Sequence, residues 1–102
     1  MKPIRLTKDA QQDLKNIQDY TRGEFGREQT KRYMRHLREG FKHIRRHPEI
    51  GFPIDHLKTG YRCFAIEYHK VFYTLTDESI AVVAVLHESQ LPMRHLKQRK
   101  ND

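Results

Sequence analysis

Apolar residues are concentrated in the last third of the chain, in three runs separated by very short connections. The runs read YRCFAIEY, VFYTLT and IAVVAVL, with only HK and DES between them. Val, Ile, Phe and Tyr suit a pleated, half-buried surface, and connections of two or three residues favour hairpins. The pattern therefore predicts an antiparallel three-stranded meander from Tyr61 to Leu86. Because residues 80–86 are apolar at every position, the third strand should be the most buried.

Two amphipathic helices are predicted upstream of the meander, over residues 8–22 and 27–46. Each has an apolar stripe whose members recur every three or four residues. The first stripe consists of Ala10, Leu14, Ile17 and Tyr20, and the second of Tyr33, Leu37, Phe41 and Ile44. Gly23 and Gly26 should end the first helix and set the turn. The two helices should therefore pack as an antiparallel hairpin against one face of the sheet.

A short alternating run, Ile4–Leu6, precedes the helices and predicts a first strand, with Thr7 as the helix N-cap. This strand cannot form a hairpin with the helix that follows, so it should join the sheet after the helical hairpin has crossed one face. Residues 48–60 are expected to be a turn-rich connection. Gly40, within the second helix, indicates either a close approach of another backbone or a tolerated glycine. The predicted fold class is α+β, with an N-terminal strand, a helical hairpin and a meander completing one sheet.

The length and charge of the chain limit its organisation and its partners. A chain of 102 residues predicts a single domain over residues 1–102. It carries 20 Lys and Arg against 13 Asp and Glu, a net charge of +7, which favours nucleic acid, an acidic protein or a nucleoprotein complex as partner. Since the cations are spread along the chain, a plain solvated surface is the alternative. Residues 94–102 are expected to form a basic, frayed tail.

Cysteine and histidine positions argue against disulfide and metal sites. Cys63 is the only cysteine, which excludes a disulfide within the chain and fits a reducing cytoplasm. His43 and His47 lie four residues apart but have no third ligand nearby, so neither a metal nor another cofactor is expected. The N-terminus has no apolar signal run, and no stretch approaches the roughly 20 apolar residues of a membrane span. A cytoplasmic protein without a membrane partner is therefore predicted.

Arg62, His69 and His87 are the candidate catalytic set. Cleavage of a phosphodiester without a metal requires a base, an acid and a cation for the phosphate. Arg62 begins the first meander strand and His87 ends the last, so they should lie at opposite ends of the sheet unless it is strongly twisted. His69 lies in the first tight turn and reaches the end of the sheet that carries His87 only if the strand register allows it. The spacing therefore favours structural roles over catalysis.

Short motifs are spread over nearly the whole chain in a recognisable order. They are Leu6-Thr7 with Ala10 and Asp13-Leu14, Ile17 with Tyr20-Thr21, Phe25-Gly26 with Gln29 and Tyr33, Phe41 with His47-Pro48 and Gly51, Gly60-Tyr61-Arg62, Val71-Phe72-Tyr73, and Val85-Leu86-His87 with Arg94-His95-Leu96. In this order the chain resembles the ParE branch of the RelE/ParE superfamily of bacterial toxins. The fold of that family, a strand, a helical hairpin and an antiparallel sheet, agrees with the order of elements predicted above.

The resemblance implies the toxin of a type II toxin–antitoxin system. ParE-like toxins act on DNA gyrase by binding rather than catalysis, and a ParD-like antitoxin neutralises them in a hetero-oligomer. The expected target-binding residues are Arg62, Arg94, His95, Lys97, Arg99 and Lys100, with gyrase-bound DNA as a further expected contact. An antitoxin helix is expected in a groove between the hairpin and the sheet. The expected antitoxin-binding residues are Tyr20, Tyr33, Leu37 and Phe41.

Two alternatives and two departures from the family accompany this hypothesis. The first alternative is a RelE-like ribosome-dependent endoribonuclease that uses Arg62, His69 and His87, and the second is a plain basic nucleic-acid-binding domain. RelE-type cleavage generally uses an aromatic hydroxyl near the C-terminal strand, but no Tyr follows His87. This departure argues against the ribonuclease. Many family members carry a basic residue where this chain has Ala84, which leaves weakened toxicity open.

Overall fold

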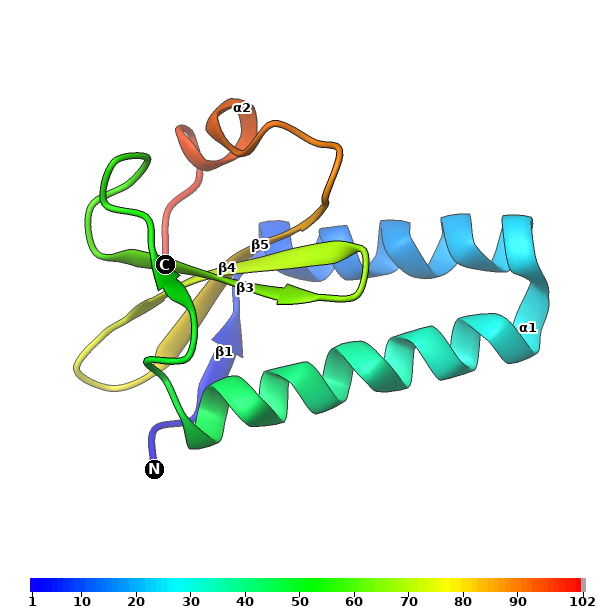
Figure 1. The fold of residues 1–102 in the computed structure, drawn as a ribbon, viewed down its shortest axis with the longest axis horizontal. Coiled ribbons are helices and arrows are strands. Elements are labelled where there is room, and N and C mark those ends of the chain that lie inside the picture. The colour runs from blue at the N-terminus through cyan, green and yellow to red at the C-terminus, as the bar shows by residue number, and fades with distance from the viewer. Residues whose placement is uncertain (102) are drawn as a thin grey trace.

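The computed structural model describes residues 1–101 and arranges them as one sheet with helices on its two sides (Figure 1). The elements in chain order are β1 (Ile4–Leu6), α1 (Lys8–Arg46), β2 (Phe52–Pro53), β3 (Tyr61–Ile66), β4 (His69–Leu75), β5 (Ile80–His87) and α2 (Pro92–Leu96). The sheet order is β1-β5-β4-β3-β2. The long α1 hairpin lies along one side and the short α2 lies on the other. The predicted α+β class is confirmed.

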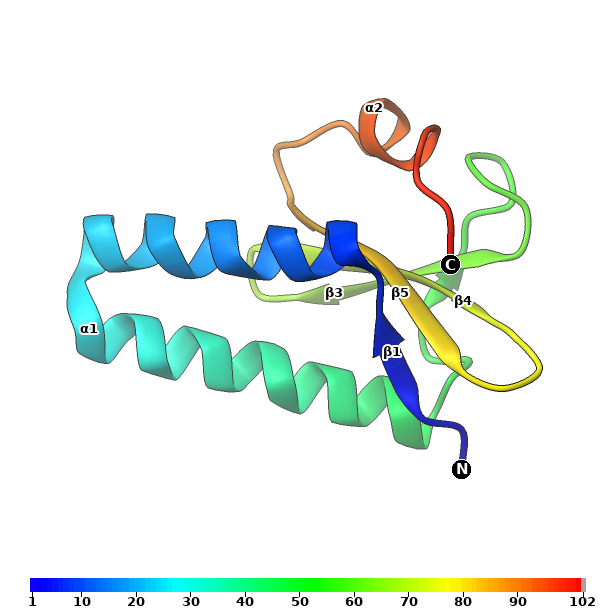
Figure 2. The same cartoon turned by 180° about the vertical axis from the view of Figure 1, so that it is seen from behind.

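β1 joins the sheet, as the sequence predicts, and the structure shows that it does so by pairing parallel with β5. Ile4 lies opposite Ile80 and Leu6 opposite Val82 (Figure 2). The α1 hairpin crosses one face of the sheet between β1 and the later strands. Thr7 then begins α1, because its side chain accepts a hydrogen bond of 3.2 Å from the amide of Ala10. The amide of Thr7 donates to the Val82 carbonyl at 3.0 Å, which ties the start of the helix to the central strands.

α1 is a hairpin of two helical arms that meet at Gly26. The arms cover residues 8–25 and 27–46, so the predicted end of the first helix near residue 22 is wrong. Gly23 stays within the helix, and the turn is made at Gly26 alone, where φ is 82°. Glycine adopts this left-handed conformation without the steric penalty that a Cβ imposes. The Thr30 hydroxyl donates to the Gly26 carbonyl at 2.7 Å and steadies the bend.

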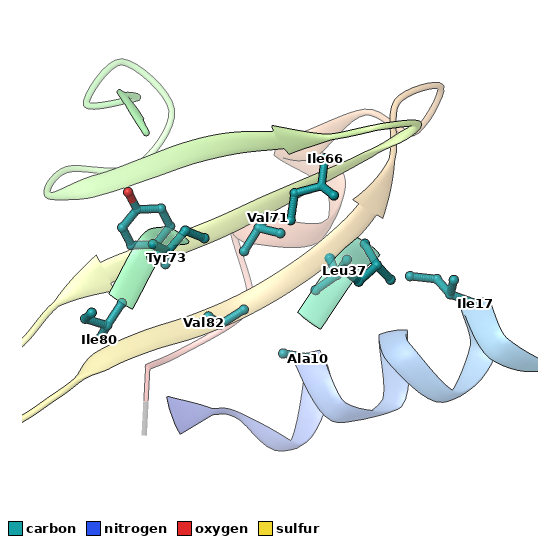
Figure 3. Close-up of a cluster of buried hydrophobic side chains, with 10 residues drawn as sticks. Ala10, Ile17, Leu37, Ile66, Val71, Tyr73, Ile80 and Val82 are labelled. Atoms are coloured by element: carbon teal, nitrogen blue, oxygen red, sulfur yellow. The ribbon is translucent and has the colours of Figure 1, made fainter. Parts of the chain in front are cut away.

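β5 lies at the centre of two hydrophobic clusters, one on each side of the sheet. The cluster under α1 consists of Ala10, Ile17, Leu37, Ile44, Ile66, Val71, Tyr73, Ile80, Val82 and Val85 (Figure 3). The cluster under α2 consists of Ile54, Tyr61, Phe72, Val83, Ala84, Leu86 and Leu96. Every residue from 80 to 86 is at most 2% exposed, so the prediction that this is the most buried strand is confirmed. Tyr20, expected in the first stripe, lies outside the core with 67% of its surface exposed.

Two details of the sheet differ from the sequence prediction. The β3–β4 turn consists of Glu67 and Tyr68, not of the expected HK pair, because His69 already pairs within β4. Glu67 takes a left-handed φ of 55° there, which is uncommon for a residue other than glycine. β2 lies in the expected turn-rich connection and pairs Phe52 with Cys63 at the edge of the sheet. An edge is the position in a sheet that tolerates a proline such as Pro53.

The segment expected to fray is anchored through residue 101. Leu96 of α2 is 1% exposed, and the Lys58 ammonium donates to the Leu96 carbonyl at 2.9 Å. The Arg99 guanidinium binds the Asp13 carboxylate at 2.6 Å and the Val83 carbonyl at 3.0 Å. The expectation of a frayed basic tail over residues 94–102 is therefore wrong for residues 94–101, because Leu96 and Arg99 are held by the core, and residue 102 lies outside the described residues.

Gly40 is required by a neighbouring side chain rather than by a backbone. A Cβ at this position would lie 2.1 Å from Cδ1 and 2.7 Å from Cγ1 of Ile66. We expect Gly40→Ala to lower the free energy of unfolding by about 1–3 kcal/mol, because the crowding outweighs the better helix propensity of alanine. Gly23→Ala is the matched control, since no atom lies within 4 Å of its added Cβ. Urea denaturation measures both, and a stabilised Gly40→Ala variant would contradict the packing.

Candidate functional site

A hollow of about 770 Å³ opens between the two arms of α1, the β3–β4 turn and the end of β5. We call it the aromatic hollow, because ring-bearing side chains dominate its lining. These are Tyr20, Phe25, Tyr33, His36, Tyr68, His69 and His87. The bend at Gly26 holds the arms apart, and the tight β3–β4 turn brings its residues to face them. The hollow therefore depends on three segments that are distant in sequence.

Tyr33, His69 and His87 form a contiguous polar group in the aromatic hollow. The strand register places His69 directly opposite His87. Their rings meet edge to face with centroids 5.3 Å apart, and the Tyr33 and His69 ring centroids are 5.4 Å apart. The Tyr33 hydroxyl and Nδ1 of His69 form a hydrogen bond. The register thus brings together the two histidines whose proximity the sequence left undecided.

Tyr33 and His69 are uncharged at neutral pH. Burial, reinforced by the charge of His87, lowers the pKa of His69 to about 4. Burial also raises the pKa of Tyr33 to about 12. His69 is then neutral and Tyr33 keeps its proton, so the hydrogen bond between the hydroxyl and Nδ1 joins two neutral groups, with the donor set by the His69 tautomer. His87 is oriented separately, since its Nδ1 lies 2.8 Å from the Ser89 hydroxyl. Tyr33 and His69 thus offer oriented, uncharged polar groups beside Arg32 and Glu67, which also line the hollow.

The pKa of His69 predicts a pH dependence of stability. The folded-state pKa, about 4, lies below the ordinary value of 6.5, so the unfolded chain binds more protons between these pH values. The contribution to stability is therefore complete above pH 6.5 and is lost as the pH falls toward 4. We expect His69→Gln to flatten this part of the profile, measured by urea denaturation from pH 4 to 8. The exposed control His56→Gln should leave the slope unchanged, and equal slopes in both variants would contradict the assignment.

Large aromatic side chains at the rim of the hollow are exposed to solvent. Tyr20, Phe25 and Tyr68 are 67%, 63% and 60% exposed. Clustered exposed apolar surface is typical of interaction sites. The helical stripe identifies Tyr20 from the sequence. Phe25 and Tyr68 were not predicted as site residues, because Phe25 was assigned to the helix turn and Tyr68 to a strand. The rim is suited to receive an apolar segment of a partner.

Arg62 lies far from the two histidines along the sheet. Arg62 pairs with Tyr73, whereas His69 pairs with Ile66 at the other end of β3. Its guanidinium donates to the carbonyls of Gly51 and Glu49 at 2.8 and 3.2 Å. Arg62, His69 and His87 are therefore not assembled into one catalytic site. Both hydrogen bonds come from Nη1 of the guanidinium that was expected to bind the target.

The expected antitoxin-binding residues are divided between the hollow and the core. Tyr20 and Tyr33 line the aromatic hollow. Leu37 is 1% exposed inside the cluster under α1, so its place among the binding residues is wrong. Phe41 is half-buried against the same cluster. The stripe of the second helix therefore faces the sheet over most of its length and reaches the hollow only at Tyr33.

The basic residues near the C-terminus differ in availability. Arg94, Lys97 and Lys100 are exposed. His95 is half-buried, and Arg99 is held by Asp13, with a guanidinium only 15% exposed. Ala84 is fully buried beneath α2, so this position contributes no surface in this chain. Three of the expected target-binding residues therefore remain free to contact a partner.

Within residues 1–101 there is no group of three His, Cys, Asp or Glu side chains placed to hold a metal ion. In the same part of the chain, no helix has the length and apolar character needed to cross a membrane. The Cys63 thiol is half-buried, and burial raises its pKa above the ordinary value. A reactive thiolate is therefore not favoured at that position.

Comparisons with known proteins agree on one family. Residues 4–92 match the family described as the ParE toxin of type II toxin–antitoxin systems, parDE. The chain is 38% identical to Toxin ParE1 of Caulobacter vibrioides, over 94% of this chain and 99% of that protein. It is 34% identical to Toxin ParE of Escherichia coli, over 92% of each chain. A chain from the chromosomal ParDE system of P. aeruginosa shares the fold, with a TM-score of 0.75 at 18% identity over 85% of this chain and 96% of that one.

Proposed function

The chain belongs to the ParE family of toxins of type II toxin–antitoxin systems, and we propose that it arrests growth by binding DNA gyrase. The family match over residues 4–92 carries this proposal. As such a toxin it has an antitoxin partner. Inhibition by binding needs no proton transfer, because a domain that binds one state of an enzyme more tightly holds the enzyme in that state. The separation of Arg62 from His69 and His87 is consistent with a toxin that does not act as a nuclease.

The charge of the toxin supports binding to a nucleoprotein target. The chain carries a net charge of +7, which accelerates encounter with a complex that contains DNA. Arg94, Lys97 and Lys100 project from α2 and the segment after it, and all three are exposed. Because Leu96 and Arg99 anchor this segment, the three cations are presented from an ordered surface. We assign them to target binding, and we assign Arg62 and Arg99 to structural roles.

A supercoiling assay with purified gyrase tests the proposal. Toxin in stoichiometric excess over gyrase should abolish supercoiling of a relaxed plasmid. The variant with Arg94, Lys97 and Lys100 all replaced by Ala should inhibit less at equal concentration while melting at an unchanged temperature. Unchanged supercoiling in the presence of excess folded wild-type toxin would overturn gyrase as the target.

The antitoxin is proposed to place an apolar segment in the aromatic hollow. An amphipathic helix binds a groove by inserting apolar residues spaced three or four apart, and exposed aromatic side chains are the usual anchors. Tyr20, Phe25 and Tyr68 supply such a rim, while Tyr33 and His69 offer uncharged polar groups at the base. The net positive charge would attract an acidic, ParD-like arm. The expected complex is a hetero-oligomer of toxin and antitoxin.

Replacing Tyr20 with Ala is expected to weaken antitoxin binding by about 10- to 100-fold, the range typical of an aromatic anchor. Stability should change little, because the side chain is 67% exposed. Titration calorimetry with the antitoxin measures the affinity. Phe52→Ala is the matched control, since Phe52 is 80% exposed on β2 outside the hollow. Equal losses in the two variants would show that the antitoxin does not use the hollow.

A further inference from the structure

A second hollow, of about 440 Å³, lies between the arms of α1 and shares no lining residue with the aromatic hollow. We call it the basic hollow, because five of its eight lining side chains are cations. These are Arg22, Arg27, Lys31, Arg35 and Arg38. Arg22 comes from the first arm and the other four come from the second. The bend at Gly26 therefore gathers them into one concave surface.

The cations of the basic hollow have no compensating charge. No carboxylate lines it, and within residues 1–101 none of the five makes an ion pair or a side-chain hydrogen bond. Two acidic residues of the same hairpin are already engaged elsewhere, Asp19 by Lys15 at 3.1 Å and Glu39 by Lys42 at 3.4 Å. Like charges held together without counter-charge destabilise the compact chain and favour a bound anion.

The spacing of these cations suits an extended polyanion. Arg27, Lys31, Arg35 and Arg38 lie four, four and three residues apart, so they follow one side of the second arm. Eleven residues of helix extend about 16 Å. Duplex DNA carries one charge per roughly 1.7 Å of its axis, so about ten phosphates lie beside such a length. A single small anion would use only part of this row.

We propose that the basic hollow binds the phosphate backbone of duplex DNA. Guanidinium groups, four of the five cations, bind phosphate through two parallel hydrogen bonds. No aromatic side chain lines the hollow, so it lacks the stacking platform that single-strand binders use. Met34 is the only apolar residue in the lining, which leaves little anchor for an amphipathic acidic peptide. The binding is independent of base sequence, because phosphate contacts carry no sequence information directly.

This inference does not rest on gyrase as the target, since the hollow would bind DNA with or without the enzyme. When the toxin acts on gyrase, the basic hollow would contact the DNA that gyrase holds. The basic hollow lies on a different surface of the toxin from Arg94, Lys97 and Lys100. A wild-type toxin that inhibits supercoiling but does not bind duplex DNA would overturn the inference and leave the proposed function standing. A toxin that binds duplex DNA but does not inhibit supercoiling would overturn the proposed function and leave the inference standing.

Fluorescence anisotropy of the full chain with a labelled 30-base-pair duplex over a series of salt concentrations tests the inference. Each neutralised phosphate contributes about 0.9 to the slope of log affinity against log salt, so five contacts predict a slope of about −4.5. Replacing Lys31, Arg35 and Arg38 together with Ala should reduce the slope by about 2.7 and weaken binding at 0.1 M salt by about 100-fold. Circular dichroism should show a melting temperature that is unchanged or higher, because all three side chains are exposed and their mutual repulsion is removed.

The matched control removes the same charge from other places on the molecule. Lys8, Arg45 and Arg46 are exposed and line neither hollow, so their joint replacement by Ala should leave the slope near the wild-type value. Equal slopes in the two triple variants would overturn the inference, because net charge alone would then explain the binding. Tighter binding to the single strand of the same sequence, or to a polyglutamate peptide, than to the duplex would also overturn it.

Discussion

Replacing Asp13 with Ala is expected to lower the free energy of unfolding by about 3–5 kcal/mol, the range for removing one partner of a buried ion pair. The Asp13 carboxylate binds Nη1 and Nη2 of Arg99 at 2.6 and 3.1 Å, and it accepts a hydrogen bond of 2.9 Å from the Val85 amide. The two charged side chains are only 12% and 15% exposed, so water cannot replace the lost partner. The hydrogen bond from Asp13 also raises the pKa of Arg99.

Chemical denaturation of Asp13→Ala and of the double variant Asp13→Ala with Arg99→Met checks this prediction. The double variant should recover part of the loss, because it removes the uncompensated guanidinium. Asp19→Ala is the exposed control, since its carboxylate is 54% exposed in its ion pair with Lys15, and it should change stability by less than about 1 kcal/mol. A loss at Asp13 no larger than at Asp19 would contradict the role of this pair as an anchor of the C-terminal segment.

Replacing Tyr73 with Ala is expected to lower the free energy of unfolding by about 3–5 kcal/mol, as for other buried aromatic residues. Its ring is fully buried in the cluster under α1. Its hydroxyl donates to the Pro48 carbonyl at 2.7 Å and accepts from the Gly51 amide at 2.9 Å. One side chain therefore fills the core and also fixes the path of the chain from α1 to β2.

Tyr73→Phe separates these two roles. It keeps the ring but leaves two backbone groups without their partner, so the expected loss is about 1–3 kcal/mol. Denaturant melts of both variants measure the difference. A loss in Tyr73→Phe equal to that in Tyr73→Ala would assign the whole effect to the hydroxyl. A neutral Tyr73→Phe would show that water satisfies the Pro48 and Gly51 backbone groups.

The elements of the fold were predictable wherever one physical constraint dominated. Residues 80–86 of β5 are all apolar, which predicts a buried strand. β1 is followed at once by the helical hairpin, so it can pair with a later strand only after the hairpin has crossed a face of the sheet. The turn at Glu67 was not predictable, because a left-handed glutamate has no sequence signal comparable to glycine. Gly23 was wrongly predicted to end the first helix. A helix tolerates an exposed glycine at a cost of about 1 kcal/mol, so a glycine alone does not mark a helix end.

The candidate site was predictable only in part. Helical periodicity identified the side of the second helix that carries Tyr33 and Leu37. Periodicity shows which way a side chain points but not how deeply it is buried, and Leu37 lies in the core. The contact of His69 with His87 depends on strand register, and a shift of one residue turns a side chain to the other face. The ion pair of Asp13 and Arg99 joins positions 86 residues apart and leaves no local pattern.

The parallel pairing of β1 with β5 also affects when the toxin can fold. β1 emerges during translation before the other strands of the sheet, yet its partner strand begins only at Ile80. At 5–20 residues per second, the nascent chain needs roughly 4–15 s to make the intervening segment. Until then the two arms of α1 have no β5 surface beneath them. The sheet therefore closes late in synthesis, and an incomplete polypeptide does not present the finished toxin surface.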